Sequence, residues 1–430
     1  MTVKDRFPAT SPTIAGVSTT DLAQQFGTPT YLYDAETITQ RIEQLRRFDV
    51  IRYAQKANSN LAILDLMRRQ GVLVDAVSAG EIHRAKRAGY LLTGESAPVV
   101  YTADIFDRAS LDLVVDENVH VNLGSPDMIS QYGERVTEGK ITLRINPGFG
   151  HGHNRKTNTG GDHSKHGIWH EQLEQCIELA KQNGLTVAGL HMHIGSGTDF
   201  EHLSQVCSAM YQMACKVGPS IETISAGGGL PTAYRSSDES IDVDRYFEVW
   251  DQTRQQLQGD LGHAISLEIE PGRFLVADAG YLLTEIRAVK KMGDNLFYPV
   301  DAGFNNLAHP IMYGAYHPMS IAHSQPRELE MQPVVVGGPL CESGDIFTQL
   351  EGGLVEPRLL PVATVGDFLV IHCAGAYGFV MSSNYNSKPF ATEVLISEAV
   401  PRVIRSRQTP EDLFAGEFLD ETDANDSSGS

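Results

Sequence analysis

Cysteine pairs, long apolar runs and an excess of positive charge are all missing from this sequence. Only five cysteines occur in 430 residues and none forms a Cys-x-x-Cys pair, which disfavours a disulfide framework and a structural zinc site. No apolar run reaches about 18 residues, and the N-terminus lacks a charged segment followed by an apolar one. We therefore expect a cytoplasmic protein without a membrane span.

Basic residues are few relative to acidic ones. Lysine and arginine total 34 against 54 aspartates and glutamates, which gives a formal net charge of −20. Such a field repels nucleic-acid phosphates and anionic lipids, so we expect neither nucleic acid nor membrane as a partner. An anionic cofactor or substrate then needs a locally positive pocket.

Short apolar runs alternate with amphipathic stretches between about residues 46 and 284. This alternation is typical of parallel strands joined by helical crossovers. Roughly eight such units predict a closed (β/α)8 barrel, with an open doubly wound sheet as the alternative. The strand candidates are 49–55, 72–77, 98–101, 119–123, 141–146, 187–194, 221–225 and 266–269.

The helical period fades after Gly280, where short apolar runs are separated by Gly, Pro and Asp turns. These runs predict a β-sandwich or small β-barrel, to which 29–33 adds a strand. We expect 46–284 to form the barrel, 1–45 and 285–420 the β-domain, and the acidic, Ser-rich 421–430 a disordered tail. The later strand candidates are 281–289, 297–300, 333–336, 367–372, 392–396 and 401–406.

Lys56 follows the first barrel strand directly, in Tyr-Ala-Gln-Lys-Ala-Asn-Ser-Asn. The carboxyl ends of barrel strands form the face where such folds place their sites. Desolvation at that face favours a neutral amine, which attacks an aldehyde. A solvated lysine at a strand end would look the same, so only the accompanying motifs make Lys56 a catalytic candidate.

His191-Met-His193-Ile-Gly-Ser-Gly ends another strand, where alternation places both imidazoles on one face. A pair of metal ligands is the obvious alternative interpretation, although a His-x-His pattern alone is weak support for a metal site. The histidine-rich stretch from His151 to His166 has no acidic partner at convincing spacing, so we expect loop histidines with structural hydrogen bonds there.

Two further motifs follow the last barrel strands. Gly227-Gly228-Gly229 offers successive N–H groups for an anion such as phosphate, although a tight turn has the same pattern. Glu270-Pro-Gly272-Arg273 offers a carboxylate for an electropositive ring nitrogen and a guanidinium for an anion, with a rim ion pair as the alternative. In the β region, Cys341-Glu342-Ser-Gly-Asp and Gly-Ala-Tyr377-Gly lie in glycine-bounded loops.

Taken together and in this order, these motifs resemble the fold-type III pyridoxal-5′-phosphate (PLP) decarboxylases, most closely the diaminopimelate decarboxylase family. The similarity runs from about Phe26 to Arg407 and includes Asn146-Pro-Gly-Phe-Gly-His-Gly-His and Lys165-His-Gly-Ile. Each motif is weak alone, whereas the ordered set is specific. The resemblance implies a PLP-binding barrel, a C-terminal β-domain and a homodimer, with an amino acid as substrate and no metal.

The resemblance assigns a role to each candidate residue. Lys56 would carry PLP as a Schiff base, His193 would stack on its ring and Glu270 would pair with its pyridine nitrogen. Cys341, the proton donor, and Glu342, which grips the distal amine of the substrate, would come from the neighbouring subunit. The other assignments are Ser196, Gly227, Gly228 and Gly229 for phosphate, Arg273 for phosphate or substrate, Tyr377 near both, and Asp75, Arg144 and Gly272 near the cofactor.

One position departs from the family pattern. In 301–313, His309 stands where diaminopimelate decarboxylases usually have an arginine that would join Arg273 and Tyr313 in holding the carboxylate that is not cleaved. An imidazole lacks the bidentate fork that fits a carboxylate. A charge-assisted hydrogen bond is worth about 1.5–3 kcal/mol, so the substitution bears on substrate identity.

Three hypotheses follow. The first is decarboxylation of meso-diaminopimelate to L-lysine, a step of lysine biosynthesis. The second is the same chemistry on another substrate, such as a citryl-diamino acid of siderophore biosynthesis, D-lysine or D-ornithine. The third is a non-catalytic PLP-binding relative, which the joint presence of Lys56, Glu270 and Cys341 disfavours.

Overall fold

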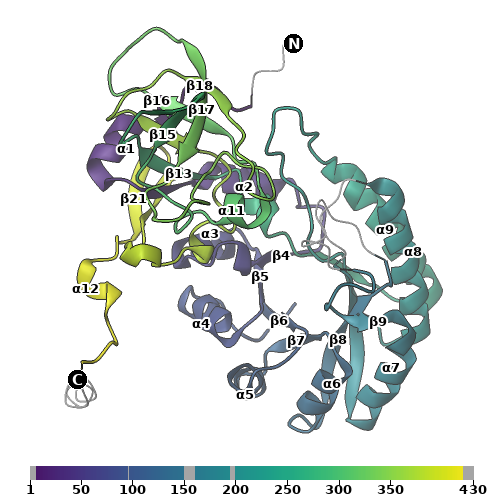
Figure 1. Ribbon diagram of the computed structural model, residues 1–430. Helices are drawn as coiled ribbons and strands as arrows, with labels where there is room; N and C mark the ends of the chain where they lie inside the picture. Colours follow the sequence, from purple (N-terminus) through teal and green to yellow (C-terminus); the bar gives the residue numbers. More distant parts are fainter. Residues whose placement is uncertain (1–5, 95, 150–159, 194–198, 420–430) are drawn as a thin grey trace. The chain divides into compact units, whose positions relative to one another are not determined.

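The computed structural model describes residues 6–94, 96–149, 160–193 and 199–419, and Figure 1 shows their arrangement. Residue contacts divide the chain into two compact units. Unit 1 contains Asp34–Gly280 and Cys373–Val380, and unit 2 contains Phe7–Tyr33, Tyr281–His372 and the chain from Met381 onward.

Unit 1 is built on a closed barrel of parallel strands. Neighbouring strands pair in chain order, and β10 pairs with both β11 and β8, while β12 pairs with β4 and completes the ring. This closure confirms the predicted barrel and excludes an open doubly wound sheet. The barrel strands are β4 (Val50–Ala54), β5 (Leu73–Ala76), β6 (Val99–Ala103), β7 (His120–Leu123), β8 (Gly139–Asn146), β10 (Leu185–His191), β11 (Thr223–Ser225) and β12 (Ser266–Ile269), and β9 (Ile168–Trp169) pairs with the end of β8.

Helices follow the strands of the barrel, and most begin at a residue whose side chain caps the first turn. Asn60, Ser78, Asp107, Ser125 and Asp199 each accept a hydrogen bond from a backbone N–H one turn ahead, which satisfies donors that a helix start leaves free. The helices are α2 (Ala35–Glu43), α3 (Leu61–Arg69), α4 (Ala79–Arg87), α5 (Arg108–Asp116), α6 (Pro126–Gly133), α7 (Leu173–Gln182), α8 (Phe200–Val217), α9 (Val243–Leu261) and α10 (Arg273–Val276).

Polar side chains occupy positions along the barrel strands that branched apolar residues usually fill. Arg52 on β4 forms a buried, bidentate ion pair with Glu268 on the neighbouring β12, at 2.7 and 2.9 Å. His120 on β7 is hydrogen-bonded to Thr142 on β8 at 2.9 Å, and its pKa is lowered to about 4, first by burial and then by Arg52. Because β4 and β7 are not neighbours, this interaction between Arg52 and His120 crosses the barrel interior.

Unit 2 contains two larger sheets. One has the strand order β16-β19-β13-β3-β20-β21 and the other β14-β15-β17-β18, in which only the β15–β17 pairing is parallel. The strands are β3 (Thr30–Asp34), β13 (Gly280–Glu285), β14 (Lys290–Met292), β15 (Asn295–Pro299), β16 (Met319–Ala322), β17 (Met331–Gly337), β18 (Arg358–Pro361), β19 (Phe368–Ile371), β20 (Thr392–Ser397) and β21 (Val400–Arg405). A small hairpin of β1 (Thr13–Ile14) and β2 (Val17–Ser18) and the helices α1 (Thr19–Phe26), α11 (His309–Tyr313) and α12 (Pro410–Leu413) complete the unit.

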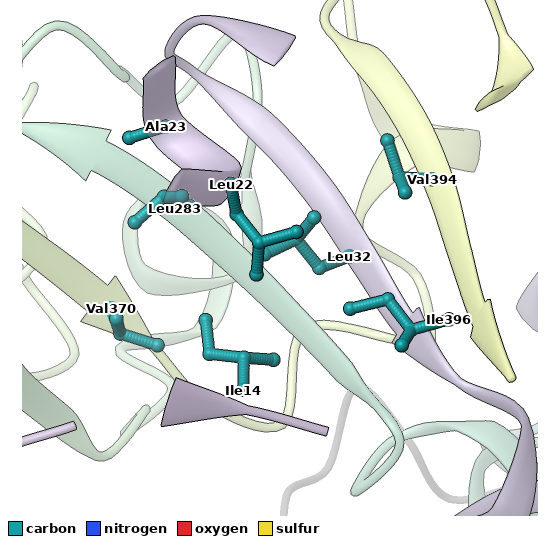
Figure 2. Close-up of a cluster of buried hydrophobic side chains, with 8 residues drawn as sticks. All are labelled: Ile14, Leu22, Ala23, Leu32, Leu283, Val370, Val394 and Ile396. Atoms are coloured by element: carbon teal, nitrogen blue, oxygen red, sulfur yellow. The ribbon is translucent and has the colours of Figure 1, made fainter. Parts of the chain in front are cut away.

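The core of unit 2 joins segments that lie far apart in the sequence. Figure 2 shows Ile14 and Leu22 from the N-terminal segment beside Leu32 of β3, Leu283 of β13 and Ile396 of β20. Leu32 is fully buried. The N-terminal segment is therefore a structural part of the C-terminal β-domain, as predicted for the strand at 29–33.

The two units confirm the predicted fold class, a (β/α)8 barrel with a C-terminal β-domain. The contact division differs from the expected ranges, because 34–45 and 373–380 group with the barrel. Helix α2 packs on α10, and the Gly375 N–H donates to the carbonyl of Ala277 at 3.2 Å. No periodicity in the sequence reveals such contacts. Within the described residues, no helix is both long and apolar enough to cross a membrane.

Replacing Leu32 with alanine tests the core of unit 2. A cavity at this fully buried position is expected to cost about 2–5 kcal/mol, seen as a lower urea midpoint in circular dichroism. Leu354→Ala is the matched control, because Leu354 is 67% exposed and is expected to change stability by no more than about 0.5 kcal/mol. Equal midpoints for both variants would contradict the assignment of Leu32 to the core.

Candidate active site

Chemically active side chains gather where the barrel strands end. Lys56 lies in the 3-10 turn Gln55–Ala57 directly after β4, and Glu270 follows β12, the strand that pairs with β4. The carboxyl ends of parallel barrel strands lie on one face, which brings these residues together. Lys56 is exposed between two buried neighbours, and its charge acts on both Asp75 and His193.

Glu270 is buried and held through both carboxylate oxygens. His191 at the end of β10 donates from Nε2 to Oε2 at 2.6 Å, and the hydroxyl of Ser225 at the end of β11 donates to Oε1 at 3.1 Å. Burial acts to raise the pKa of Glu270, but His191, Arg52 and Ser225 hold it below its ordinary value. The alternative of a rim ion pair between Glu270 and Arg273 is therefore wrong, since Glu270 is paired with His191 inside the barrel.

Asp75 at the end of β5 is the second buried acid of the site. Burial and the nearby carboxylate of Glu270 raise the pKa of Asp75 to about 6, while Thr102, Lys56 and His191 act in the opposite direction. Two carboxylates in one buried site do not both ionise easily. The two pKa shifts run in opposite directions, so Glu270 ionises at lower pH than Asp75.

The glycine loop after β11 packs against His193. A Cβ on Gly227 would lie 2.4 Å from the Met192 carbonyl, and one on Gly228 would lie 2.6 Å from the Glu270 carbonyl and 2.9 Å from Cε1 of His193. The Gly228 N–H donates to Nδ1 of His193 at 3.0 Å. Burial, reinforced by Lys56 and Arg144, lowers the pKa of His193 well below its ordinary value. The imidazole is therefore neutral and fixed in orientation.

Arg273 and Tyr377 lie together beside the backbone that carries Lys56. The guanidinium of Arg273 stacks over the Tyr377 ring at 4.8 Å and donates to the Tyr234 hydroxyl at 2.6 Å. The Tyr377 N–H donates to the carbonyl of Ala57 at 2.8 Å. A Cβ on Gly272 would lie 3.2 Å from the Ala54 carbonyl, so Gly272 allows the loop to approach the end of β4 closely.

An ion network that the sequence did not predict surrounds Arg144. Asp104, after β6, accepts hydrogen bonds from Nδ1 of His166 at 2.5 Å and from the Gly167 N–H at 2.8 Å, and lies 3.9 Å from Arg144. Burial opposes ionisation of Asp104, but His166 and Arg144 bring its pKa below the ordinary value. His166 makes the structural hydrogen bond expected of these loop histidines, and its acidic partner, 62 positions away in the sequence, could not be found from local spacing.

Glu81 is a second ionisable group that sequence reasoning missed. Its carboxylate accepts a hydrogen bond from the Val77 N–H at 2.8 Å, while the Ser78 hydroxyl accepts one from the Glu81 N–H. Burial raises the pKa of Glu81 to about 7, and the charge of Lys56 opposes that rise. Serine followed by glutamate three residues later is a capping-box pattern. The sequence therefore contained a signal for Glu81, but that signal predicts a helix start rather than a catalytic role.

Cys341 and Glu342 are exposed on a loop of unit 2. The Cys341 N–H donates to Asn386 at 2.8 Å, and the buried carboxylate of Asp345 accepts from the backbone N–H groups of Leu340 and Phe304, both at 2.8 Å. Asp345 thus fixes the loop against the segment that leads to His309.

His309 and Tyr313 are the first and last residues of α11, also in unit 2. His309 is buried, and its ring packs edge-on against Tyr313 at 5.6 Å and near His317 at 5.8 Å. His309 thus contacts Tyr313 within this unit, while their predicted role in holding a substrate carboxylate stays a prediction.

Ser196 and the loop histidines from His151 to His153 lie outside the described residues, as does the expected tail at 421–430. For these predictions the structure provides no test. His163, in the described part of the same histidine-rich stretch, is exposed and lies 3.8 Å from Asp162.

The donor set of unit 1 fits PLP. The exposed amine of Lys56 suits an aldehyde, and the buried, ionised Glu270 suits a protonated ring nitrogen. Gly227 and Gly228 are buried and leave no room for a Cβ, and their N–H groups donate to Ser225 and His193. Oδ1 of Asp75 is buried and finds no hydrogen-bond partner among the described residues, which leaves it an acceptor for a ligand.

His191, His193 and Glu270 also have potential metal-ligand atoms within 4.8 Å of one another. The existing hydrogen bonds from His191 to Glu270 and from Gly228 to His193 favour an internal network instead. The absence of a metal from the working site stays a prediction.

Comparison with known proteins identifies relatives over nearly the whole chain. The family model described as pyridoxal-dependent decarboxylase, pyridoxal binding domain, matches residues 35–277. The diaminopimelate decarboxylase of Streptomyces coelicolor is 56% identical over 398 residues, which cover 92% of this chain and 90% of that protein. The enzyme of the same name from Escherichia coli K12 is 51% identical over 401 residues, covering 93% and 96%.

Solved structures agree with these relatives. A crystal structure of diaminopimelate decarboxylase with 51% identity superposes with a TM-score of 0.90 and covers 93% of this chain and 95% of that one. The diaminopimelate decarboxylase of M. jannaschii in complex with L-lysine, at 28% identity, has a TM-score of 0.84 and covers 95% and 96%.

Gly228→Ala tests the glycine loop as part of the PLP site. The added methyl must displace either the Glu270 carbonyl or the His193 ring, so we expect PLP affinity to fall by about tenfold or more, the worth of one charge-assisted hydrogen bond. PLP titration of the apoprotein by fluorescence measures this. Gly259→Ala on α9 is the control, because nothing lies within 4 Å of its added Cβ. Unchanged affinity in Gly228→Ala would remove the loop from the site.

Proposed function

This chain belongs to the diaminopimelate decarboxylase family of PLP-dependent carboxy-lyases, and we propose that its substrate is meso-diaminopimelate, which it converts to L-lysine and CO2. The observation that carries this proposal is the identity of 56% and 51%, over more than nine-tenths of the chain, to decarboxylases named for that substrate. The reaction is a step of lysine biosynthesis.

We assign cofactor binding to unit 1. Lys56 would hold PLP covalently, His193 would lie against its ring, and Glu270 would keep a proton on the ring nitrogen. When bound, PLP supplies an electron sink for the pair released with CO2. The phosphate would be held by Ser196 and the glycines at 227–229, with Arg273 and Tyr377 nearby. Asp75, Arg144 and Gly272 complete the proposed cofactor set.

Proton transfer and substrate recognition require residues of unit 2. Cys341 is the proposed general acid that delivers a proton to the substrate carbon once CO2 has left, a step typically worth about 10²–10⁴-fold in rate. Glu342 would pair with the distal amine, while Arg273, His309, Tyr313 and Tyr377 would bind the rest of the substrate.

The proposed working form is a homodimer with shared sites, in which Cys341 and Glu342 act in the partner's barrel. Their exposure supports this role, because a residue that serves another subunit must be accessible on its own. The proposed division of labour has 46–284 as the PLP-binding barrel and 1–45 with 285–420 as the β-domain, in the cytoplasm.

His309 supports a second candidate, the same chemistry on a different amino acid. The side chain is buried and already packed on Tyr313, and an imidazole is a weaker carboxylate partner than a guanidinium. A substrate without the second carboxylate, such as D-lysine or D-ornithine, or with a larger group there, such as a citryl-diamino acid, would not need the arginine.

The primary test is CO2 release from meso-diaminopimelate, compared with D-lysine, D-ornithine and a citryl-diamino acid. We expect meso-diaminopimelate to have the highest kcat/KM, with L-lysine as product. Borohydride should bleach the visible absorbance of the holoenzyme and fix the label on the Lys56 peptide, and Lys56→Ala should lose both. A colourless protein that ignores added PLP would contradict the proposal.

His309→Arg separates the two substrate candidates. If meso-diaminopimelate is the natural substrate, the variant should change its kcat/KM by less than about tenfold, because the other contacts already suffice. A gain of more than about 100-fold, with a matching loss on another substrate of the panel, would favour the second candidate.

Mixing two inactive variants tests the shared site. Lys56→Ala and Cys341→Ala homodimers should each lose most activity, whereas their mixture should recover about one quarter of it, since a statistical mixture forms one intact site in half of the dimers. Cys215→Ala, which changes another exposed cysteine, is the control for Cys341→Ala and should remain active. No recovery on mixing would place Cys341 and Lys56 of one site on the same chain.

A further inference from the structure

The register of β10, β11 and β12 places His191, Ser225 and Glu268 side by side on neighbouring strands. His191 on β10 pairs with Ser225 on β11, and Ser225 pairs with Glu268 on β12. Glu270 is two residues beyond Glu268, so its side chain points to the same face of the chain. The Glu270 N–H also donates to the Gly227 carbonyl at 2.8 Å, which continues the ladder past the strand ends. The contact between His191 and Glu270 is therefore fixed by the sheet rather than by a flexible loop.

Both oxygens of Glu270 have a protein donor, yet each keeps an acceptor site. His191 approaches Oε2 at 2.6 Å and Ser225 approaches Oε1 at 3.1 Å. A carboxylate offers about four lone-pair sites, so a further donor such as a ring N–H can still bind. Ser225 in turn accepts the Gly227 N–H at 3.1 Å, which ties the carboxylate to the glycine loop.

The environment of Glu270 contains a competing acid. Asp75 is buried nearby, and the two carboxylates raise each other's energy when both are charged. The other charged groups that act on this pair are Arg52 from β4, Lys56 from the turn after β4 and, on Asp75, Glu81 from α4. Arg52 is already committed to a bidentate ion pair with Glu268. His191 hydrogen-bonds directly to Glu270, as the uncharged Ser225 does.

We infer that His191 is a positioning residue that makes Glu270 the first acid of the Asp75–Glu270 pair to ionise and holds this carboxylate ready for the ring nitrogen of PLP. The inference rests on the proposed function, because it concerns the same cofactor site. It assigns to His191 a task distinct from that of His193, although the two imidazoles are only two residues apart.

The pKa shifts support this assignment. Against the effect of burial, the attraction of His191 is the largest influence that lowers the pKa of Glu270, and the hydrogen bond from His191 is the next. On Asp75, burial and Glu270 dominate, and His191 ranks below Thr102 and Lys56. His191 therefore favours ionisation of Glu270 more than that of Asp75. Without it, the pKa of Glu270 rises towards that of Asp75, and protonation of the ring nitrogen is less favoured.

Two substitutions of His191 separate its hydrogen bond from its charge. His191→Gln keeps an amide donor near the position of Nε2 but cannot become cationic, whereas His191→Leu removes both. His120→Gln is the matched control, because His120 is a half-buried barrel histidine that is bonded to Thr142 instead. The measurements are the PLP dissociation constant of each apoprotein and the pH dependence of the cofactor absorbance in each holoprotein.

We expect His191→Leu to weaken PLP binding by about 10–100-fold, the range for a buried charge-assisted contact. His191→Gln should recover affinity to within about tenfold of wild type, but its absorbance should titrate at a lower pH than in wild type, since the ring nitrogen loses its proton more easily. His120→Gln should match wild type in both measurements. If His191→Leu does not fold, the pH titration of His191→Gln decides.

Several results would overturn the inference. They are wild-type affinity and titration in both His191 variants, no recovery of affinity in His191→Gln, or an equal loss in His120→Gln. Stoichiometric Zn²⁺ binding to the apoprotein that disappears equally on substitution of His191, His193 or Glu270 would assign the cluster to a metal instead. A wild-type protein that binds no PLP would refute the proposed function itself, which distinguishes that failure from a failure confined to His191.

Discussion

A buried negative charge inside the barrel is the constraint on which the rest of the site depends. Ionised Glu270 at 3% exposure would be prohibitively unfavourable without partners. His191 and Ser225 bind its oxygens, while Arg52 supplies a positive field that Glu268 in turn neutralises. This chain of pairings explains why the barrel strands carry charged and hydroxyl groups where branched aliphatic residues are usual. Asp75, whose Oδ1 finds no hydrogen-bond partner among the described residues, has its pKa raised to about 6 by burial and by Glu270.

Local sequence patterns predicted the barrel and the ends of its strands. The alternation of apolar runs with amphipathic stretches, and the polar residues that end each strand, can be recognised within a few neighbouring positions. Lys56, His191 and Glu270 were identified in this way, each in a motif at the end of a strand. The link between Asp104 and His166 was not predictable, since it joins residues 62 positions apart through the order of the strands. The contact of His191 with Glu270, 79 positions away, has the same origin. A single sequence therefore shows where a residue lies along its strand, but it does not show which residue of another strand that residue contacts.

Residues with positive φ and glycines in close backbone contact show how the segment 373–380 is held in the barrel unit. Tyr377 has a φ of 54°, an unusual conformation for a residue with a side chain, and it holds its ring against Arg273. The adjacent Gly375 lies so close to Val276 that a Cβ would stand 1.8 Å from its carbonyl oxygen. These contacts anchor 373–380 in the barrel unit although its neighbours in sequence belong to the β-domain. The division expected from periodicity missed this exchange, because a short irregular loop has no period.

Family membership depends on residues along the whole chain, whereas substrate preference depends on a few residues. Identity of 51–56% over the chain involves hundreds of positions and fixes the fold, the cofactor and the reaction. Preference for one carboxylate at the far end of a substrate depends on a few side chains, and one charge-assisted hydrogen bond of about 1.5–3 kcal/mol changes affinity by roughly 10–150-fold. His309 sits buried on Tyr313, so an arginine there would need space that the ring now fills. We therefore propose that a few side chains around His309 decide the substrate specificity of this enzyme, a difference that overall sequence identity does not reveal.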